Sequence, residues 1–279
     1  MTGTLYVVPT PIGNLEDITQ RALRVLREVD VIAAEDTRHS RKLLTHYGIG
    51  TRLVSYHQHT KRTGLGRILE ALETGDVALI SDSGTPSISD PGYELVCAAL
   101  EAGYHVTTLP GPSAVVTAVV DAALPARGFV FMGFLPRSKG DRESRLNEVA
   151  RLPYSLVFFE APSRVVRTLQ AVLLILGDRQ VVAVREMTKI HEEAMRGTVS
   201  EVLARFQTTE PRGEFTIVVA PDESAQVGYT DEEIAEALRV PLAEGSSVRD
   251  AVQLISQAFG VPRTDVYRVW IQSSRDSDR

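Results

Sequence analysis

The sequence VALISDSGTPSISDPG, residues 77–92, contains the pattern from which the fold class can be inferred. Its first four residues are apolar, which predicts a short buried strand. The next twelve are small or polar apart from Ile88, and a segment with helical periodicity follows at 93–102. A buried strand, a loop and a helix in this order form the repeating unit of an α/β protein.

The same unit recurs along most of the chain. Strands are expected at 5–8, 31–34, 53–56, 77–80, 105–109, 129–134, 155–159, 180–185 and 215–220. Helices are expected at 15–29 (capped by Asn14), at 40–47, in a segment ending at 73, and at 93–102, 113–123, 164–176 and 199–206. This alternation predicts largely parallel sheets with helices on both faces. Ligands of such sheets bind beyond the C-terminal ends of the strands, so the loops after strands are where chemistry is expected.

The length predicts more than one domain, because 279 residues exceed an ordinary compact domain. We expect a first α/β domain at 1–123 and a second at 124–222. Beyond a linker at 221–229 the strand pattern stops, and helical periodicity at 231–239, 248–259 and 264–271 predicts a C-terminal module at 230–279. This module is either a helix-turn-helix or a helical hairpin that covers a sheet edge.

Several classes of protein are excluded by composition. Cys97 is the single cysteine, which excludes a disulfide framework and a cysteine-rich zinc site and fits a reducing cytosol. No apolar run approaches the roughly 20 residues that span a membrane, and the N-terminus lacks the pattern of a signal peptide. We therefore expect a cytoplasmic protein. His57 and His59 would face one side of a strand, but no third ligand is marked nearby, so no metal is expected.

The net charge is negative, but basic residues are concentrated in two stretches of the chain. The net charge of −6 disfavours a nucleic-acid partner, but binding follows the local potential. Between Arg38 and Leu69 there is no Asp or Glu, and this stretch contains four of the six histidines. We expect it to contact an anionic partner. A second basic cluster, from Arg137 to Arg151, is diluted by acidic residues, and a solvated surface is an equal alternative for it.

Four loops that follow expected strands are candidates for a site. The loops at 9–14, 81–92 and 110–114 are built of small residues, and Asp82 and Asp90 can accept hydrogen bonds from a ligand. None contains the glycine pattern of a dinucleotide-binding loop, a P-loop or a serine hydrolase elbow. The loop at 185–193 contains a lysine, a histidine and three glutamates. It is a candidate acid/base site, with a solvated helix start as the alternative.

Nine segments, taken together and in order, resemble one known family. They are residues 8–15, 34–38, 55–59, 82–92, 110–114, 133–137, 158–164, 185–193 and 212–215. They resemble the small-subunit ribosomal RNA 2′-O-methyltransferase I family of the tetrapyrrole-methylase-like superfamily. The similarity covers about residues 4–222, and the helical tail resembles the family's C-terminal extension. The tetrapyrrole branch usually has a glycine-rich first loop and Gly-Asp-Pro in the second, whereas Gly84-Thr85-Pro86 here matches the RNA branch.

The resemblance implies a fold, a reaction and a set of cofactor positions. It implies two α/β domains with S-adenosylmethionine in the cleft between them, and a homodimer. It also implies methylation of the ribose 2′-hydroxyl of a decoding-centre cytidine in 16S ribosomal RNA, presented as RNA or as the 30S subunit. The cofactor positions of the superfamily correspond to Ile12, Ser83, Gly84, Thr85, Ile88, Ser113, Ala114, Glu160 and Met187.

The reaction suggests roles for further residues. A ribose hydroxyl is a poor nucleophile while protonated, so a base, or a cation that stabilises the alkoxide, is expected. We assign this role to Lys189 with Glu192, and we expect Asp36 and Arg38 at the acceptor site, with His59 as a further candidate. The residues expected to bind RNA phosphates are Arg41, Lys42, Lys61, Arg62, Arg137, Lys139, Arg142 and Arg145.

Two other functions are compatible with the sequence. One is a methyltransferase that acts on a small molecule such as a tetrapyrrole, against which the acid-free basic stretch and the helical tail argue. The other is a non-catalytic RNA-binding factor on the same fold, which would bind S-adenosylmethionine without transferring its methyl group to any ribosomal substrate.

Overall fold

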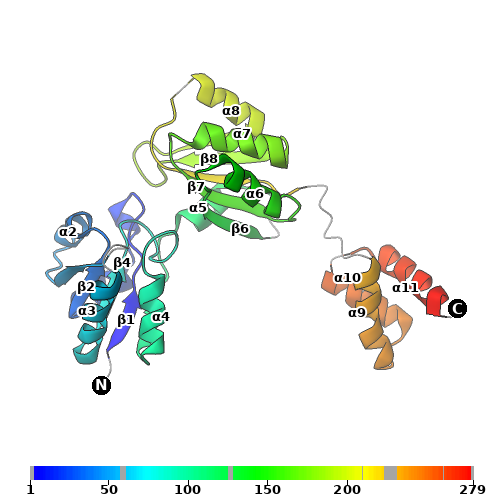
Figure 1. Cartoon of the computed structure of the whole chain (residues 1–279), viewed down its shortest axis with the longest axis horizontal. Coiled ribbons are helices and arrows are strands. Elements are labelled where there is room, and N and C mark those ends of the chain that lie inside the picture. The colour runs from blue at the N-terminus through cyan, green and yellow to red at the C-terminus, as the bar shows by residue number, and fades with distance from the viewer. Residues whose placement is uncertain are drawn as a thin grey trace. The chain divides into compact units, whose positions relative to one another are not determined.

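A computed structural model describes residues 3–56, 61–124, 128–208, 210–222, 231–259 and 261–277. The chain forms two compact units (Figure 1). The first comprises Met1–Val149 and Tyr154–Ala220, and the second comprises Ala150–Pro153 and Pro221–Arg279. The first unit contains two β-sheets with their helices, and the second is helical. The α/β fold class expected from the sequence is confirmed.

The first sheet is parallel throughout. Its strands are β1 (Thr4–Val7), β2 (Val31–Ala34), β3 (Arg52–Ser55), β4 (Val77–Ile80) and β5 (His105–Thr108), in the order β3-β2-β4-β1-β5. Every residue of β2 and β4 is buried, because helices cover both faces. These helices are α1 (Gln20–Glu28) and α2 (Thr37–His46) on one face, and α3 (Lys61–Thr74) and α4 (Tyr93–Glu101) on the other.

The second sheet is mixed, which corrects the expectation of largely parallel sheets. Its strands are β6 (Phe129–Phe134), β7 (Ser155–Glu160), β8 (Gln180–Arg185), β9 (Glu193–Thr198) and β10 (Phe215–Val219), in the order β6-β7-β10-β8-β9. β6 pairs parallel with β7, whereas the pairings β7–β10, β10–β8 and β8–β9 are antiparallel. The connection between β8 and β9, residues 186–192, is too short for the crossover that a parallel pair needs.

The helix α5 (Ala114–Ala122) joins the two sheets into one unit. It follows the last strand of the first sheet, but its buried residues Val115, Ala118 and Ala122 pack against β7, β8 and β10. The helices α6 (Lys139–Val149), α7 (Val165–Leu176) and α8 (Val199–Thr208) complete this part of the chain. The domain boundary expected after residue 123 lies between α5 and β6 in the chain. By its packing, however, α5 belongs to the core of the second sheet.

Some expected elements differ in their bounds. The helix expected at 15–29 is divided into a 3₁₀ helix, η1 (Leu15–Asp17), and α1, because Thr19 caps α1 by accepting from the Ala22 amide. Asn14 caps η1 instead. Two described elements, α6 and β9, were not expected, and α11 extends beyond the helix expected at 264–271.

The second unit contains α9 (Asp231–Ala243), α10 (Val248–Phe259) and α11 (Arg263–Ser277). Their buried residues form a core of their own, in which Leu238 of α9, Ile255 of α10 and Val266 of α11 take part. In the described part of the chain no helix is long and apolar enough to cross a membrane.

Candidate functional site

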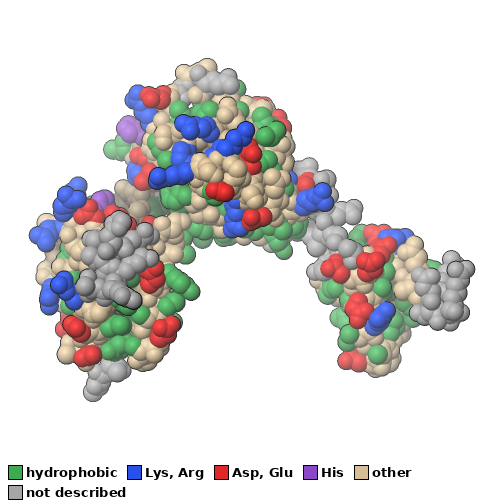
Figure 2. Space-filling model, in the orientation of Figure 1, with side chains coloured by type: hydrophobic (Ala, Val, Ile, Leu, Met, Phe, Trp, Pro, Cys, Tyr) green, Lys and Arg blue, Asp and Glu red, His purple; other side chains and the backbone are tan. Residues whose placement is uncertain are grey.

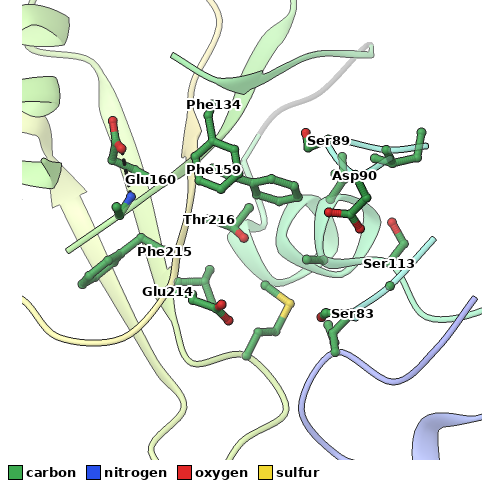
Figure 3. A pocket seen from close by; sticks show the side chains of 18 of the residues that line it. Ser83, Ser89, Asp90, Ser113, Phe134, Phe159, Glu160, Glu214, Phe215 and Thr216 are labelled. Carbon is green, nitrogen blue, oxygen red and sulfur yellow. Dashed lines mark hydrogen bonds between the residues drawn. The ribbon is translucent and has the colours of Figure 1, made fainter. Parts of the chain in front are cut away.

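A cavity of about 330 Å³ lies where loops and strand ends of the two sheets meet (Figure 3). We call it the first cavity. The loop after β4 forms one wall, and the ends of β6, β7 and β10 form another. All nine residues at the expected cofactor positions are among those that line it: Ile12, Ser83, Gly84, Thr85, Ile88, Ser113, Ala114, Glu160 and Met187.

The loops after β1 and β4 are joined into one rigid wall. Thr10 and Gly84 form an isolated antiparallel bridge, with amide-to-carbonyl distances of 2.9 and 3.0 Å. The buried Thr10 hydroxyl also donates to the Ser81 carbonyl at 3.1 Å. Gly84 has φ +76°, a conformation that favours glycine, and a Cβ there would lie 3.4 Å from Ile12. The wall therefore presents backbone and small side chains closely to whatever occupies the cavity.

One side of the first cavity is apolar. Phe134 and Ile88 line it and are 55% and 45% exposed, although both are large apolar residues. The ring of Phe134 lies 5.6 Å from that of Phe159, centroid to centroid, and both are visible in Figure 3. Exposed apolar side chains inside a cavity indicate a ligand with an apolar or aromatic face.

Asp90 is the acidic side chain on the β4 wall of this cavity (Figure 3). Burial raises the pKa of its carboxyl to about 6, and the charge of Asp82 adds to the shift. A hydrogen bond from Ser81 acts in the opposite direction. The carboxyl is therefore mostly ionised at neutral pH, with a pKa suited to accepting a proton. The sequence marked Asp90 as a hydrogen-bond acceptor but not as an acid/base residue.

Glu160 lines the first cavity with its backbone. Its side chain is fully buried and turns away from the cavity, as Figure 3 shows. The carboxylate accepts from the Ala161 amide at 2.8 Å, from Thr168, and from Arg164 Nη2 at 3.3 Å, and its Oε1 lies 3.0 Å from Arg164 Nε. Arg164 also donates to the Leu135 carbonyl. The carboxylate therefore fixes the ends of β6 and β7, and it is not available to a ligand in this arrangement.

Lys189 lies between the carboxylates of Glu186 and Glu214, whereas the sequence suggested Glu192 as its partner. Its Nζ is 3.1 Å from Glu186 Oε1 and 2.9 Å from Glu214 Oε2. Burial lowers the pKa of Lys189, but the hydrogen bonds and charges of Glu214 and Glu186 outweigh it and hold the pKa above its ordinary value. Lys189 is therefore an ammonium at neutral pH, which suits stabilisation of an anion better than removal of a proton.

Glu192 has a different contact from the one expected. Its carboxylate accepts from the Thr188 amide at 2.9 Å, which closes the loop between β8 and β9. Glu214 was part of a quoted motif but was assigned no role. Lys189 and Glu214 lie 25 residues apart in the sequence, and only the pairing of β10 with β8 brings them together.

Asp36 and Arg38 form the start of α2. The Asp36 carboxylate accepts from the Arg38 amide at 2.8 Å and lies 3.3 Å from the Arg38 guanidinium, whose side chain is 91% exposed. Hydrogen bonds from Arg38 lower the pKa of Asp36. Neither residue is among those described as lining the cavities. His57 and His59 lie outside the described residues, as do the side chains of Lys61 and Arg62.

A second cavity, of about 570 Å³, adjoins the first. The two share Ile12, Ser83, Lys189 and Glu214 as lining residues. The second cavity is also lined by His39, Ser40 and Lys42 of α2 and by Asp82 after β4. The Lys189–Glu214 pair therefore lies at the wall between two spaces, an arrangement that could hold two reactants side by side.

The two basic clusters differ in what they expose. Arg41 and Lys42 are exposed on α2, and Figure 2 shows Lys and Arg side chains gathered over this helix at the left edge. In the second cluster, Arg142 is 8% exposed and donates to the Arg137 carbonyl, so its expected contact with RNA is wrong for this conformation. Lys139 and Arg145 are exposed but lie 3.8 Å from Glu143 and 2.6 Å from Glu148.

A protein-family model and several solved structures are similar to this chain. The family model of the Tetrapyrrole (Corrin/Porphyrin) Methylases matches residues 4–203. A cobalt precorrin-4 methyltransferase of known structure has a TM-score of 0.60 at 19% identity, covering 78% of this chain and 94% of that one. Uroporphyrin III C-methyltransferase of Thermus thermophilus has a TM-score of 0.57 at 21% identity, covering 78% and 97%. These similarities show the fold.

Relatives with closer sequences share one name. Ribosomal RNA small subunit methyltransferase I of Halalkalibacterium halodurans is 44% identical over 97% of this chain and 95% of its own length. The protein of the same name from Bacillus subtilis is 41% identical over 95% of this chain and 93% of its own length. Such identity over nearly the whole of both chains shows common membership. The chain therefore belongs to the tetrapyrrole methylase family and, within it, to the ribosomal RNA small subunit methyltransferase I family.

Proposed function

We propose that this protein transfers a methyl group from S-adenosylmethionine to the ribose 2′-hydroxyl of a decoding-centre cytidine in 16S ribosomal RNA, in the cytoplasm. The observation that carries the proposal is the first cavity, which all nine expected cofactor positions line and which adjoins a second cavity through Lys189. The relatives are named as methyltransferases of small-subunit ribosomal RNA, which supports the choice of substrate. In this proposal residues 1–123 and 124–222 are two domains, and 230–279 is a separate module.

The first cavity fits S-adenosylmethionine in size and chemistry. Its volume of about 330 Å³ is within the range of about 300–1,000 Å³ that is usual for small-molecule sites. The exposed faces of Phe134 and Ile88 suit the adenine ring, and the hydroxyls of Ser83 and Ser113 suit the polar parts of the cofactor. When bound, the cofactor supplies a methyl group on a positively charged sulfur, which is already activated for transfer.

The protein's own residues then need to manage one proton and one developing negative charge. We assign the proton of the ribose hydroxyl to the carboxylate of Asp90, which lines the first cavity that the ribose would face and whose raised pKa matches a base that works near neutral pH. We assign stabilisation of the developing oxyanion to the ammonium of Lys189, at the wall shared by the cavities. Glu214 and Glu186 keep Lys189 charged and fix its position. Asp36, Arg38, Glu192 and His59 remain proposed neighbours of the acceptor.

We propose that exposed cations bind the RNA backbone of the free RNA or of the 30S subunit. Arg41 and Lys42 on α2 belong to the acid-free stretch, and Lys61 and Arg62 follow in the same stretch. Arg137, Lys139 and Arg145 form a weaker second group, because two of them already have acidic partners. Arg142 is left out of the proposal because it is buried.

We also propose that the protein is a homodimer that buries an apolar surface on α4 and α5. Tyr93 and Leu100 of α4 are 71% and 56% exposed, and Val116 and Val120 of α5 are 55% and 74% exposed. Large apolar side chains that are exposed on two successive helices of one unit are candidates for such an interface. Val120→Glu should shift the protein toward a monomer in sedimentation velocity, and an unchanged sedimentation coefficient would count against this surface.

Labelled cofactor tests the reaction itself. The purified full chain should bind S-adenosylmethionine and transfer its labelled methyl group to small ribosomal subunits that lack the modification. Ala114→Trp, which fills the first cavity, should abolish both binding and transfer. Transfer to a tetrapyrrole-like small molecule, or binding of the cofactor without transfer to any ribosomal substrate, would contradict the proposed function.

A further inference from the structure

The second cavity has the dimensions of a binding site, and the residues that line it indicate what it holds. Its volume of about 570 Å³ lies within the usual range of about 300–1,000 Å³ for small-molecule pockets. Lys189 and Glu214 form an inner wall that this cavity shares with the first cavity. A molecule seated there would therefore lie directly beside a molecule in the first cavity.

The hydroxyl of Ser40 indicates that this cavity receives a polar ligand. Ser40 lies on α2, is 2% exposed and lines the second cavity. Its Oγ is buried and has no hydrogen-bond partner among the described residues. Buried hydroxyls nearly always have a partner, so an unpartnered one on a residue that lines a cavity suggests that a ligand becomes the partner when the side chain turns toward it.

The charges around the cavity indicate what kind of ligand it is. His39 and Lys42 are exposed on α2 and line the cavity from that side, where they can bind an anion such as a phosphate. Asp82 lines it from the end of β4, with one carboxylate oxygen accepting from the Asp36 amide at 3.2 Å. A carboxylate suits hydroxyl or amino donors and repels phosphate. The ligand should therefore be anionic at one end and a hydrogen-bond donor at the other.

An apolar surface in the same cavity suits a flat ring. Leu15, which is 38% exposed, lines the cavity together with Pro11 and the buried Leu43. A nucleotide has all three of these properties: a phosphate, sugar and base groups that donate hydrogen bonds, and a flat base. A nucleotide stacked inside a helix cannot present its ribose at an inner wall, so it would have to be turned out of the stack.

We propose that the second cavity holds one nucleotide turned out of the RNA, with its phosphate against Lys42 and His39 and with Ser40 donating to it. This inference rests on the proposed function, because it identifies the acceptor's position at the same site. The ribose of that nucleotide then faces the wall that contains Lys189, beside the first cavity.

Two variants of α2 test the proposal, each with a matched control on the same helix. Lys42→Gln is compared with Arg41→Gln, because Arg41 is an exposed neighbouring cation that is not among the residues described as lining the cavity. Ser40→Ala is compared with Thr45→Ala, an exposed position outside the described lining. The readouts are KM and kcat with small ribosomal subunits, affinity for S-adenosylmethionine, and Tm.

The proposal predicts a specific pattern. Lys42→Gln should raise KM for the subunit about tenfold more than Arg41→Gln does, as expected when a charge-assisted hydrogen bond is removed. Ser40→Ala should lower kcat/KM about fivefold to tenfold without lowering Tm, because the hydroxyl has no partner within the described protein. Thr45→Ala should change neither. Cofactor affinity should be the same in all four variants.

The outcomes separate this inference from the proposed function. If the wild-type chain methylates small subunits but Lys42→Gln matches Arg41→Gln and Ser40→Ala matches Thr45→Ala, the inference is wrong and the function stands. If the wild-type chain transfers no methyl group, the function fails, and binding of cytidine 5′-monophosphate to the full chain decides the inference. Weaker binding to Lys42→Gln than to Arg41→Gln would support the cavity as a nucleotide site, and equal binding would overturn it.

Discussion

The Nζ of Lys189 lies 2.9 Å from Oε2 of Glu214, at the wall that the two cavities share. The pair joins the loop after β8 to the residue before β10. Because Glu214 and Glu186 hold Lys189 in its charged form, the site presents a fixed cation where one reactant would meet the other. In the proposed mechanism, this position lets a residue that is too basic to remove a proton assist methyl transfer.

Replacing Lys189 should therefore affect turnover and not cofactor binding. Lys189→Ala should lower kcat by about 10²-fold, the effect usual for removing one group that stabilises a developing anion. Affinity for S-adenosylmethionine, measured by calorimetry, should stay within about twofold, because Glu186 and Glu214 already pair the ammonium and it is not assigned a contact with the cofactor. Loss of cofactor binding in this variant would sink the assignment.

The pH dependence of turnover should report Asp90. Because burial raises the pKa of its carboxyl to about 6, the base is protonated below that pH and ionised above it. The kcat should therefore rise as pH increases through about 6 and level off above it. Asp90→Asn should be much slower and should lack this rise. Glu35→Gln serves as the control and should keep it, and a pH profile that is the same in wild type and Asp90→Asn would contradict the assignment.

Glu35 should make stability depend on pH. Burial raises its pKa to about 7, and the charges of Asp90, Asp82 and Asp36 add to the shift. A folded-state pKa above the ordinary value favours the protonated form, so stability is lost as pH rises from 4.5 through about 7. Glu35→Gln should therefore raise Tm at pH 8 and change it little at pH 4. An equal change at both pH values would show that the carboxyl does not titrate in this way.

The buried network of Glu160 should contribute to stability more than to binding. Removing one partner leaves an unpaired buried charge, which typically costs about 3–5 kcal/mol. Glu160→Ala leaves Arg164 without this carboxylate and also removes the hydrogen bond from Thr168. Its free energy of unfolding in urea should fall by about this amount. A stability equal to that of the wild type, together with weakened cofactor binding, would mean that the carboxylate faces the ligand after all.

The salt dependence of RNA binding should distinguish exposed from buried cations. Arg41→Glu should flatten the plot of log affinity against log salt by about 0.7–0.9 for each phosphate that the protein no longer neutralises. Arg142→Gln should leave that slope unchanged and lower Tm, because Arg142 is buried and donates to the Arg137 carbonyl. The reverse pattern would show that the second cluster, and not α2, binds the RNA backbone.

Strands buried on both faces could be predicted closely from the sequence. β4, for example, is buried at every residue and was expected at its observed bounds, because an uninterrupted apolar run leaves few alternatives. β9 was missed because it is an edge strand with a single buried residue, Met195. α6 was missed because its sequence is mostly charged and contains Gly140. The direction of β8 and β10 could not be read from periodicity, which is the same in parallel and antiparallel strands.

The loops of the candidate site could be predicted from the sequence, but the contacts between its side chains could not. The loops after β1, β4 and β5 could be found because parallel strands place their C-terminal loops at one edge. The Glu214 partner of Lys189 depends on the antiparallel pairing of β10, which joins residues far apart in the sequence. The burial of Arg142 and the unpartnered hydroxyl of Ser40 depend on three-dimensional packing, and no local pattern marks either one.

Mapping the methylated nucleoside shows whether this protein methylates a ribose of small-subunit ribosomal RNA. Small ribosomal subunits from cells that lack this protein would be incubated with the full chain and labelled S-adenosylmethionine, and the RNA would then be digested and mapped by mass spectrometry. We predict 2′-O-methylcytidine at one decoding-centre position, and none with Lys189→Ala over the same time. Label on a base, on another nucleotide, or on no RNA despite measurable cofactor binding would contradict it.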